Sequence, residues 1–259
     1  MIVSWSPSSY DKYVSCPRRA KYDLVDKLCP ACFKGRLEGW DPQVCAGCGK
    51  SPEVPKPLAR GTKIHEAAEL YIGGQSKLNA ELRNVQMELK RLKLAFEAGS
   101  VLLEHKFVFN AAWQPVSKFT KGAWLRATAD VIEKRRPPRG GPGQEFHLTD
   151  WKTGGVDKRT GEIKKSGKYV DQLEIYAMCV LSSFPECSVV HSRLVFVDAP
   201  AGSNVVALDS IRPRNLGPLK KKWARKLVAM MSDEEFAPSP SPLCGWCPFS
   251  RGAGGPCSF

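Results

Sequence analysis

One segment constrains the fold of this chain more than any other, the stretch Thr149–Gly154 with the sequence TDWKTG. Apolar residues precede it and a Gly-Gly turn follows it, which predicts a strand ending near residue 152. Side chains at i and i+2 of a strand point to the same face, so Asp150 and Lys152 are predicted to lie side by side, with Trp151 turned into the opposite layer. A carboxylate beside an ammonium group can hold a divalent metal and activate its bound water. Because Asp-x-Lys is a weak signal by itself, its meaning depends on the rest of the chain.

The hydrophobic pattern predicts a domain in which strands and helices alternate. Helices are expected over 4–27, 60–72, 77–98, 169–183 and 213–231. Strands are expected over 101–109, 124–133, 145–152, 188–197 and 204–209. This order predicts the α/β class, with a sheet flanked by helices.

The charge of the chain points to a polyanionic partner. Lysine and arginine number 39 against 26 acidic residues, a net charge of +13. Such an excess favours nucleic acid first, and a solvated basic surface without a partner is the alternative.

Neither a membrane span nor a signal peptide is expected. No stretch approaches 18 consecutive apolar residues, and the N-terminus lacks a basic segment followed by an apolar one. We therefore expect a soluble protein of the cytoplasm, the host cytoplasm if the chain is encoded by a phage. There the ten cysteines would stay reduced and could bind metals.

Further polar residues flank the Asp-x-Lys segment in a suggestive order. His65 lies on a helix, Asp130 is a lone carboxylate on an apolar strand, and Gln172 and Tyr176 share one helix face at i and i+4. Each has an ordinary explanation: a core or surface histidine, an ion pair of Asp130 with Arg126, and two amphipathic helix residues. These explanations give no reason for all of them to flank one Asp-x-Lys.

Taken together, these motifs resemble the PD-(D/E)xK nuclease superfamily and, within it, the RecB-type exonucleases. The matching elements follow the family's order along nearly the whole chain: Ser6, Ser8, Cys16-Pro17, Gly61 and His65, Glu104, Asp130, Asp150-Trp151-Lys152-Thr153-Gly154, and Gln172 with Tyr176. Trp151 departs from the family's usual tyrosine. The resemblance implies a restriction-endonuclease-like fold, a central mixed sheet flanked by helices.

The resemblance also implies roles for these residues. Asp130 and Asp150 would bind Mg²⁺ or Mn²⁺, with the Trp151 carbonyl as a further ligand and His65 adding a nitrogen that favours Mn²⁺. Lys152 would orient or deprotonate the attacking water. Glu104 would support a second metal, and the Gln172 and Tyr176 pair would position either DNA or the strand that carries the lysine.

Two pairs of cysteines form a motif of their own in the segment 28–50. Cys29, Cys32, Cys45 and Cys48 have the spacing C-x2-C-x12-C-x2-C, which is typical of a tetrahedral zinc site. We expect 28–50 to be a zinc-ribbon insertion that needs its metal to fold, within a nuclease domain formed by 1–27 and 51–259. DNA and a partner protein are both open as its contacts.

A second cysteine set joins the two ends of the chain. Cys244, Cys247 and Cys257 lack a fourth ligand nearby, and Cys16 can supply it. RecB-like nucleases with an iron–sulfur cluster, such as AddB and the CRISPR-adaptation nucleases, have this arrangement, so the resemblance implies a [4Fe–4S] cluster. A second zinc ion or free thiols are the alternatives. Cys179 and Cys187 have no partners by spacing and are expected to be buried as apolar residues.

The sequence as a whole predicts a metal-dependent DNA exonuclease with an iron–sulfur cluster and a zinc ribbon. Its substrate would be single- or double-stranded DNA, in recombination, repair or phage DNA metabolism, with a recombination or replication protein as a further partner. A structure-specific endonuclease or nickase is the alternative in the same class. A non-catalytic zinc-ribbon protein that binds nucleic acid is the alternative in another class.

Overall fold

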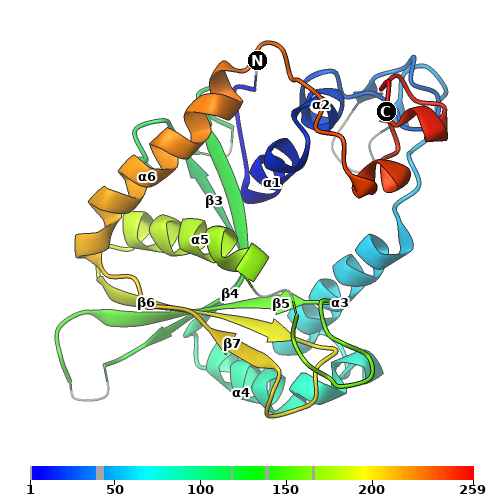
Figure 1. Ribbon diagram of the computed structural model, residues 1–259. Coiled ribbons are helices and arrows are strands. Elements are labelled where there is room, and N and C mark those ends of the chain that lie inside the picture. Colours follow the sequence, from blue (N-terminus) through cyan, green and yellow to red (C-terminus); the bar gives the residue numbers. More distant parts are fainter. Residues whose placement is uncertain (1, 39–43, 118, 138–139, 165–166) are drawn as a thin grey trace. The chain divides into compact units, whose positions relative to one another are not determined.

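Five strands form the sheet that carries the Asp-x-Lys segment, in the order β3-β4-β5-β6-β7 (Figure 1). Their bounds are Val101–Phe109, Leu125–Arg135, Gln144–Lys152, Cys187–Phe196 and Val205–Ala207. Neighbouring strands pair antiparallel except β5 and β6, which are parallel. The sheet is therefore mixed, as predicted.

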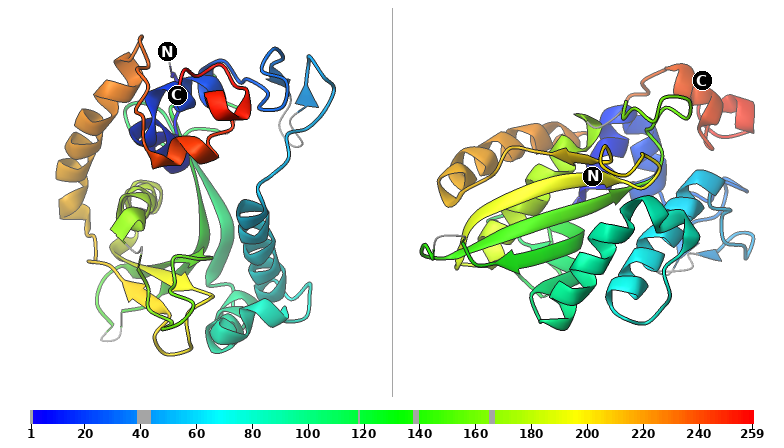
Figure 2. Two further views of the ribbon diagram at one scale, coloured as in Figure 1. Left: turned by 45° about the vertical axis from the view of Figure 1, so that its right-hand side comes forward. Right: turned by 90° about the horizontal axis from the view of Figure 1, so that it is seen from below.

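Helices cover both faces of this sheet (Figures 1 and 2). On one face are α3 (Lys56–Ile72), the 3₁₀ helix η2 (Ala80–Val85) and α4 (Gln86–Glu97). On the other face is α5 (Val170–Ser183), which follows the short 3₁₀ helix η3 (Gly167–Tyr169). The α5 helix is the crossover that a parallel strand pair requires.

An apolar layer joins α3, η2 and α4 to the sheet. Trp151 is 1% exposed and belongs to this layer, whose other strand members include Val131 and Val195. The helices contribute fully buried aliphatic side chains: Ile64, Ala68, Ile72, Leu82, Val85, Leu89 and Leu92. Burying this much apolar area is the main stabilising term of such a layer, and it fixes which face of β5 carries Asp150.

The structure, a computed structural model, describes residues 2–38, 44–117, 119–137, 140–164 and 167–259. The chain divides into two units, one formed by 55–221 and one by 1–54 with 222–259. The sheet and its helices belong to the first unit, and α6 (Pro213–Ser232) begins there. Part of the predicted ribbon, residues 39–43, lies outside the described residues.

The second unit combines the first and last segments of the chain. It contains α1 (Pro7–Ser15), α2 (Pro17–Ala20), the π-helix η1 (Lys21–Val25), β1 (Leu37–Glu38), β2 (Val44–Cys45), the end of α6, η4 (Pro242–Trp246) and η5 (Arg251–Ala253). The rings of Trp5 and Trp223 stack with centroids 5.8 Å apart. Arg18 Nε donates to the carbonyl of Phe236 at 2.8 Å. The two ends of the chain thus share one small core.

Local signals account for most element boundaries. The predicted helix start near Ser6 is confirmed, since the Ser6 side chain accepts from the N–H of Ser9 at 3.1 Å and caps α1. The helix expected from residue 60 begins earlier, at Lys56, because Pro57 occupies its first turn, where no N–H is needed. The helix expected over 77–98 was wrong as a single element. Asn79 caps a separate 3₁₀ turn, and the backbone leaves the helical region at Val85 before α4 begins.

None of the helices in the described ranges combines the length and the hydropathy needed to span a bilayer.

Candidate active site and metal centres

The last residues of β5 carry the Asp150 and Lys152 pair, as the alternation of strand side chains predicted. Lys152 Nζ lies 2.5 Å from Asp150 Oδ2. Asp150 is only 1% exposed, and the intervening Trp151 is buried in the apolar layer on the other face. A charged pair withdrawn this far from water needs further polar partners.

Gln172 on α5 supplies those partners through both ends of its amide. Its Oε1 accepts a hydrogen bond of 2.9 Å from Lys152 Nζ, and its Nε2 donates to Asp150 Oδ1 at 3.0 Å. Nε2 also donates to the hydroxyl of Tyr176 at 2.7 Å. Gln172 therefore contacts both members of the pair, and Tyr176 contacts Gln172 one helical turn later.

Asp130 on β4 is held by one side chain and one backbone group. The N–H of Trp151 donates to Asp130 Oδ2 at 2.8 Å, and His65 Nδ1 of α3 lies 3.2 Å from the same oxygen. Burial by itself lowers the pKa of His65, but the Asp130 carboxylate outweighs it and raises the pKa above its ordinary value. His65, predicted as a metal ligand, is thus in contact with one of the predicted carboxylates.

Glu104 on β3 completes a group of three ligand types. One ligand atom each from His65, Glu104 and Asp130 lie within 4.8 Å of one another. The backbone of Glu104 has φ +44°, the left-handed region that non-glycine residues rarely adopt. On either side of it the register is regular, with Leu103 opposite Val131 and His105 opposite Ala129. The distortion is therefore confined to the residue that contributes a carboxylate.

The electrostatics of this region favour a cation. Burial and the charge of Asp130 raise the pKa of Glu104 to about 7. Burial, and then the same Asp130 charge, also raises the pKa of Asp150, although Lys152 opposes the shift. The negative charges of Glu104, Asp130 and Asp150 therefore repel one another more than the neighbouring positive groups compensate. A bound divalent metal ion would relieve this repulsion. His65, Glu104 and Asp130 are the residues that could hold it, with Asp150 nearby on the next strand.

Some residues near this region were missed by the sequence analysis. Lys152 Nζ lies 4.3 Å from the ring centroid of Tyr169, a cation–π arrangement. Asp198 accepts from Gly154 N at 2.7 Å and from Arg60 Nη2 at 2.7 Å, so it anchors the turn after the Asp-x-Lys strand. The position of Asp198, just beyond the strand parallel to β5, could have indicated this contact.

Close packing explains why a glycine, Gly61, lies four residues before His65. A Cβ at Gly61 would lie 3.3 Å from Thr153 Oγ1. Glycine therefore lets α3 approach the Thr153-Gly154 turn, which brings His65 toward Asp130.

The first cysteine set converges in the second unit. The sulfur atoms of Cys29, Cys32, Cys45 and Cys48 all lie within 4.8 Å of one another. Cys29 and Cys48 are 3.9 Å apart, and Cys32 and Cys45 are 3.4 Å apart. Backbone N–H groups donate to the sulfur of Cys45 at 3.3 and 3.4 Å. These four residues could hold one metal ion.

Two glycines permit this convergence, and the sequence analysis did not single them out. A Cβ on Gly35 would lie 2.3 Å from Cys45 Sγ, and one on Gly47 would lie 2.8 Å from Gly35 Cα. The two cysteine turns can approach this closely only because both positions lack side chains.

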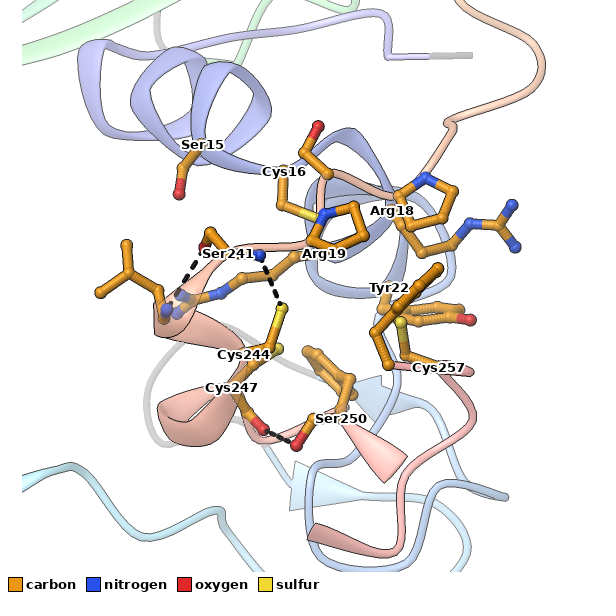
Figure 3. Close-up of a pocket in the computed structure, with 16 residues that line it drawn as sticks. Ser15, Cys16, Arg18, Arg19, Tyr22, Ser241, Cys244, Cys247, Ser250 and Cys257 are labelled. Atoms are coloured by element: carbon orange, nitrogen blue, oxygen red, sulfur yellow. Dashed lines mark hydrogen bonds between the residues drawn. The ribbon is translucent and has the colours of Figure 1, made fainter. Parts of the chain in front are cut away.

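The second cysteine set lines one pocket of the same unit (Figure 3). Cys16 comes from the start of α2 and the other three from the tail: Cys244, Cys247 and Cys257. The N–H of Ser241 donates to Cys244 Sγ at 3.4 Å. In the described part of the chain these four sulfur atoms do not form a group within 4.8 Å, unlike the first set.

The remaining cysteines are buried, as predicted. Cys179 is 0% and Cys187 3% exposed. Burial raises the pKa of Cys187 to about 11 and also raises that of Cys179. Both stay protonated at neutral pH and act as apolar side chains.

Comparison with known proteins gave one family match and several solved structures. The family model described as the PD-(D/E)XK nuclease superfamily matches residues 4–251. A candidate exonuclease from Eubacterium rectale is 13% identical with a TM-score of 0.47, over 95% of this chain and 87% of that chain. An alkaline exonuclease from Laribacter hongkongensis is 14% identical with a TM-score of 0.29, over 69% of this chain and 83% of that chain. A comparison with curated proteins returned no match.

Proposed function

The chain belongs to the PD-(D/E)XK nuclease superfamily, and on that premise we propose that it is a metal-dependent DNA exonuclease of the RecB type. One observation carries the proposal: His65, Glu104 and Asp130 form one group of ligand types. Gln172 contacts both Asp150 and Lys152, and the N–H of Trp151 between them donates to Asp130. The order of these residues along the sequence resembles that of the RecB-type exonucleases, and a structure-specific endonuclease or nickase is the alternative that the sequence does not separate from it.

The residues present fit a divalent metal. Carboxylate oxygens suit Mg²⁺ and Mn²⁺, and one imidazole shifts the preference toward Mn²⁺. His65, Glu104 and Asp130 would hold the ion, with Asp150 joining them. When bound, the metal supplies Lewis-acid activation of the phosphate and of a water.

The protein's own groups supply the rest of the reaction. The ammonium group of Lys152, fixed beside Asp150 and under Gln172, orients the attacking water and stabilises the charge that develops on the phosphate. Gln172 holds Lys152 and Asp150 in one geometry through a hydrogen bond to each, and the hydroxyl of Tyr176 accepts a further hydrogen bond from the same amide. The pair therefore positions the strand with the lysine, the second of the two roles that the resemblance implied.

The two cysteine sets are proposed as a zinc site and an iron–sulfur site. Sulfur atoms around tetrahedral zinc lie about 3.8 Å apart, given bonds of about 2.3 Å. The separations of 3.4 and 3.9 Å in the first set fit one such ion. A [4Fe–4S] cube binds one thiolate per iron and so requires wider spacing, which supports assigning it to Cys16, Cys244, Cys247 and Cys257.

The net charge of +13 supports DNA as the substrate, and we propose recombination, repair or phage DNA metabolism as its setting. The test is cleavage of labelled DNA by the full chain in Mn²⁺ and in Mg²⁺. Linear single- and double-stranded DNA, labelled at either end, is compared with covalently closed circular DNA of each kind.

An exonuclease releases short products from linear DNA and leaves the closed circles intact. Nicked or opened circles would instead indicate an endonuclease. DNA binding without cleavage in either metal would indicate the non-catalytic alternative.

A further inference from the structure

A group of metal-ligating side chains lies away from the nuclease residues, at the start of β5 and β6. It consists of Glu145, His147 and His191, with one ligand atom from each within 4.8 Å of the others. His147 and His191 are register partners on the parallel strands, and their rings stack with centroids 4.7 Å apart. The strand pairing itself therefore brings the two imidazoles together.

This group is separate from the proposed nuclease site. His147 precedes Asp150 by three residues on β5, about 10 Å along a strand. It also points to the opposite face, because positions 147 and 150 differ in parity. An ion bound here would not contact the nuclease residues.

The distances within the group fit a metal better than they fit direct hydrogen bonds. Glu145 Oε2 lies 3.7 Å from His147 Nε2 and 3.8 Å from His191 Nε2. Hydrogen bonds need about 2.7–3.2 Å. Ligand atoms of a tetrahedral ion with bonds of about 2.1 Å lie about 3.4 Å apart. Small side-chain rotations therefore suffice to form a site.

His147 Nε2 needs a partner that the described residues do not supply. The atom is buried and forms no hydrogen bond within the described part of the chain. Burying a ring nitrogen without a hydrogen-bond partner costs free energy of folding. A metal ion bound beside Glu145 would give His147 Nε2 a partner.

Neighbouring groups also shape this site. His191 Nδ1 lies 2.8 Å from Ser210 Oγ, so a proton on Nδ1 would leave Nε2 free to bind a metal. Arg135, a nearby positive charge, lies 2.7 Å from Glu133, which also pairs with Arg91. The pairing also shifts between Gln144 and Glu145, an irregularity of the kind that re-aims side chains.

We propose that Glu145, His147 and His191 bind a transition-metal ion of the zinc class, which ties β5 to β6. Two imidazoles and one carboxylate select zinc-class ions over Mg²⁺ or Ca²⁺. Three protein ligands leave a fourth position for water.

The first test counts zinc bound per chain after saturation and desalting. The double variant His147→Gln, His191→Gln should hold one zinc fewer than the wild type, whatever the thiol sites and the nuclease site retain. His105→Gln is the matched control, since His105 belongs to neither group of metal-ligating residues, and should keep the wild-type count. An equal count in the double variant would overturn the proposal.

The second test needs no variant and decides the matter if the double variant does not fold. Crystals of the wild-type chain are grown with zinc, and anomalous scattering is measured at the zinc edge. A peak between Glu145, His147 and His191 is expected. Occupied thiol sites without a peak at these three residues would contradict the proposal.

Discussion

The backbone N–H of Trp151 donates a hydrogen bond of 2.8 Å to Asp130 Oδ2. The strand that carries Asp150 and Lys152 therefore also orients the carboxylate of the neighbouring strand. The bond uses the main chain, while the indole of Trp151 packs on the other face. Asp130 is thus held by a backbone N–H as well as by His65, and Asp150 by the side chains of Lys152 and Gln172.

Lys152→Ala is expected to lower the rate of Mn²⁺-dependent DNA cleavage by about three orders of magnitude or more, because it removes the charge that faces the reacting phosphate. The protein should stay folded and bind DNA with an affinity close to that of the wild type. Lys90→Ala, at an exposed lysine of α4, is the control. Near-normal cleavage by folded Lys152→Ala protein would exclude the proposed mechanism.

Gln172→Ala is expected to slow cleavage about 100-fold without weakening DNA binding, since it releases Lys152 and Asp150 from their fixed geometry. Tyr176→Phe should have a smaller effect, because it removes only the hydroxyl that accepts from Gln172. Single-turnover rates and DNA affinities measured on both variants test this. A loss of affinity in Gln172→Ala with an unchanged rate would mean that Gln172 contacts DNA instead.

Acid should weaken the fold through Glu133, which is 5% exposed. Burial alone would raise the pKa of Glu133, but hydrogen bonds from Arg91 and Arg135 lower it to about 2. A pKa lowered in the folded state gives stability that is present above about pH 4.5 and is lost as the pH falls toward 2. The contribution at neutral pH is on the order of 2 kcal/mol after allowing for the partly exposed arginines.

Urea unfolding at several pH values measures this contribution. Glu133→Gln should unfold more easily than the wild type at pH 7 and nearly equally at pH 2. Glu97→Gln, at an exposed position of α4, should follow the wild type throughout. Parallel pH profiles for wild type and Glu133→Gln would contradict the assignment.

Anaerobically purified protein should be brown and contain about four irons per chain. Cys16→Ser should lose the colour and melt at a lower temperature, because it releases the first helices from the tail. Cys187→Ala, at a buried thiol outside both sets, should keep the iron. Colourless protein with two zinc ions and no iron would favour the double-zinc alternative.

The first cysteine set can be tested without touching a cysteine. Gly35→Ala should abolish its zinc, since the new Cβ would lie 2.3 Å from Cys45 Sγ. Gly122→Ala, where a Cβ meets nothing within 4 Å, is the control. If the ribbon contacts DNA, Gly35→Ala should also lower the affinity and its dependence on salt. Unchanged affinity with the zinc lost would assign the ribbon to a protein partner or to support of the fold.

Periodicity in the sequence was enough to predict where the strands lie and, in β5, which side chains share a face, because side chains alternate along a strand. Asp150 and Lys152 were therefore placed correctly relative to Trp151. The resemblance implied that Gln172 positions either DNA or the strand with the lysine, but its individual contacts with Asp150 and Lys152 depend on where α5 crosses the sheet. The Arg60 and Asp198 contact joins residues 138 positions apart, and only the folded chain brings them together.

Glu104 was recognised from its place in the motif order, yet its backbone conformation left no trace in the sequence. Positive φ is rare for glutamate, and nothing in the neighbouring residues indicates it. For Gly35 and Gly47 the residues are visible in the sequence, but their structural role is not. Glycines are easy to see, but their closeness to Cys45 and to each other follows only from the folded cysteine turns.

The left-handed backbone of Glu104 lowers the stability of the fold at a residue whose carboxylate belongs to the proposed metal group. A conformation of this kind costs about 1 kcal/mol or more in a non-glycine residue. Glycine or asparagine would adopt it more readily, but neither offers a carboxylate to the metal group. If Glu104 serves the proposed metal group, a selection of random variants for heat resistance alone would favour its replacement and so act against DNA cleavage.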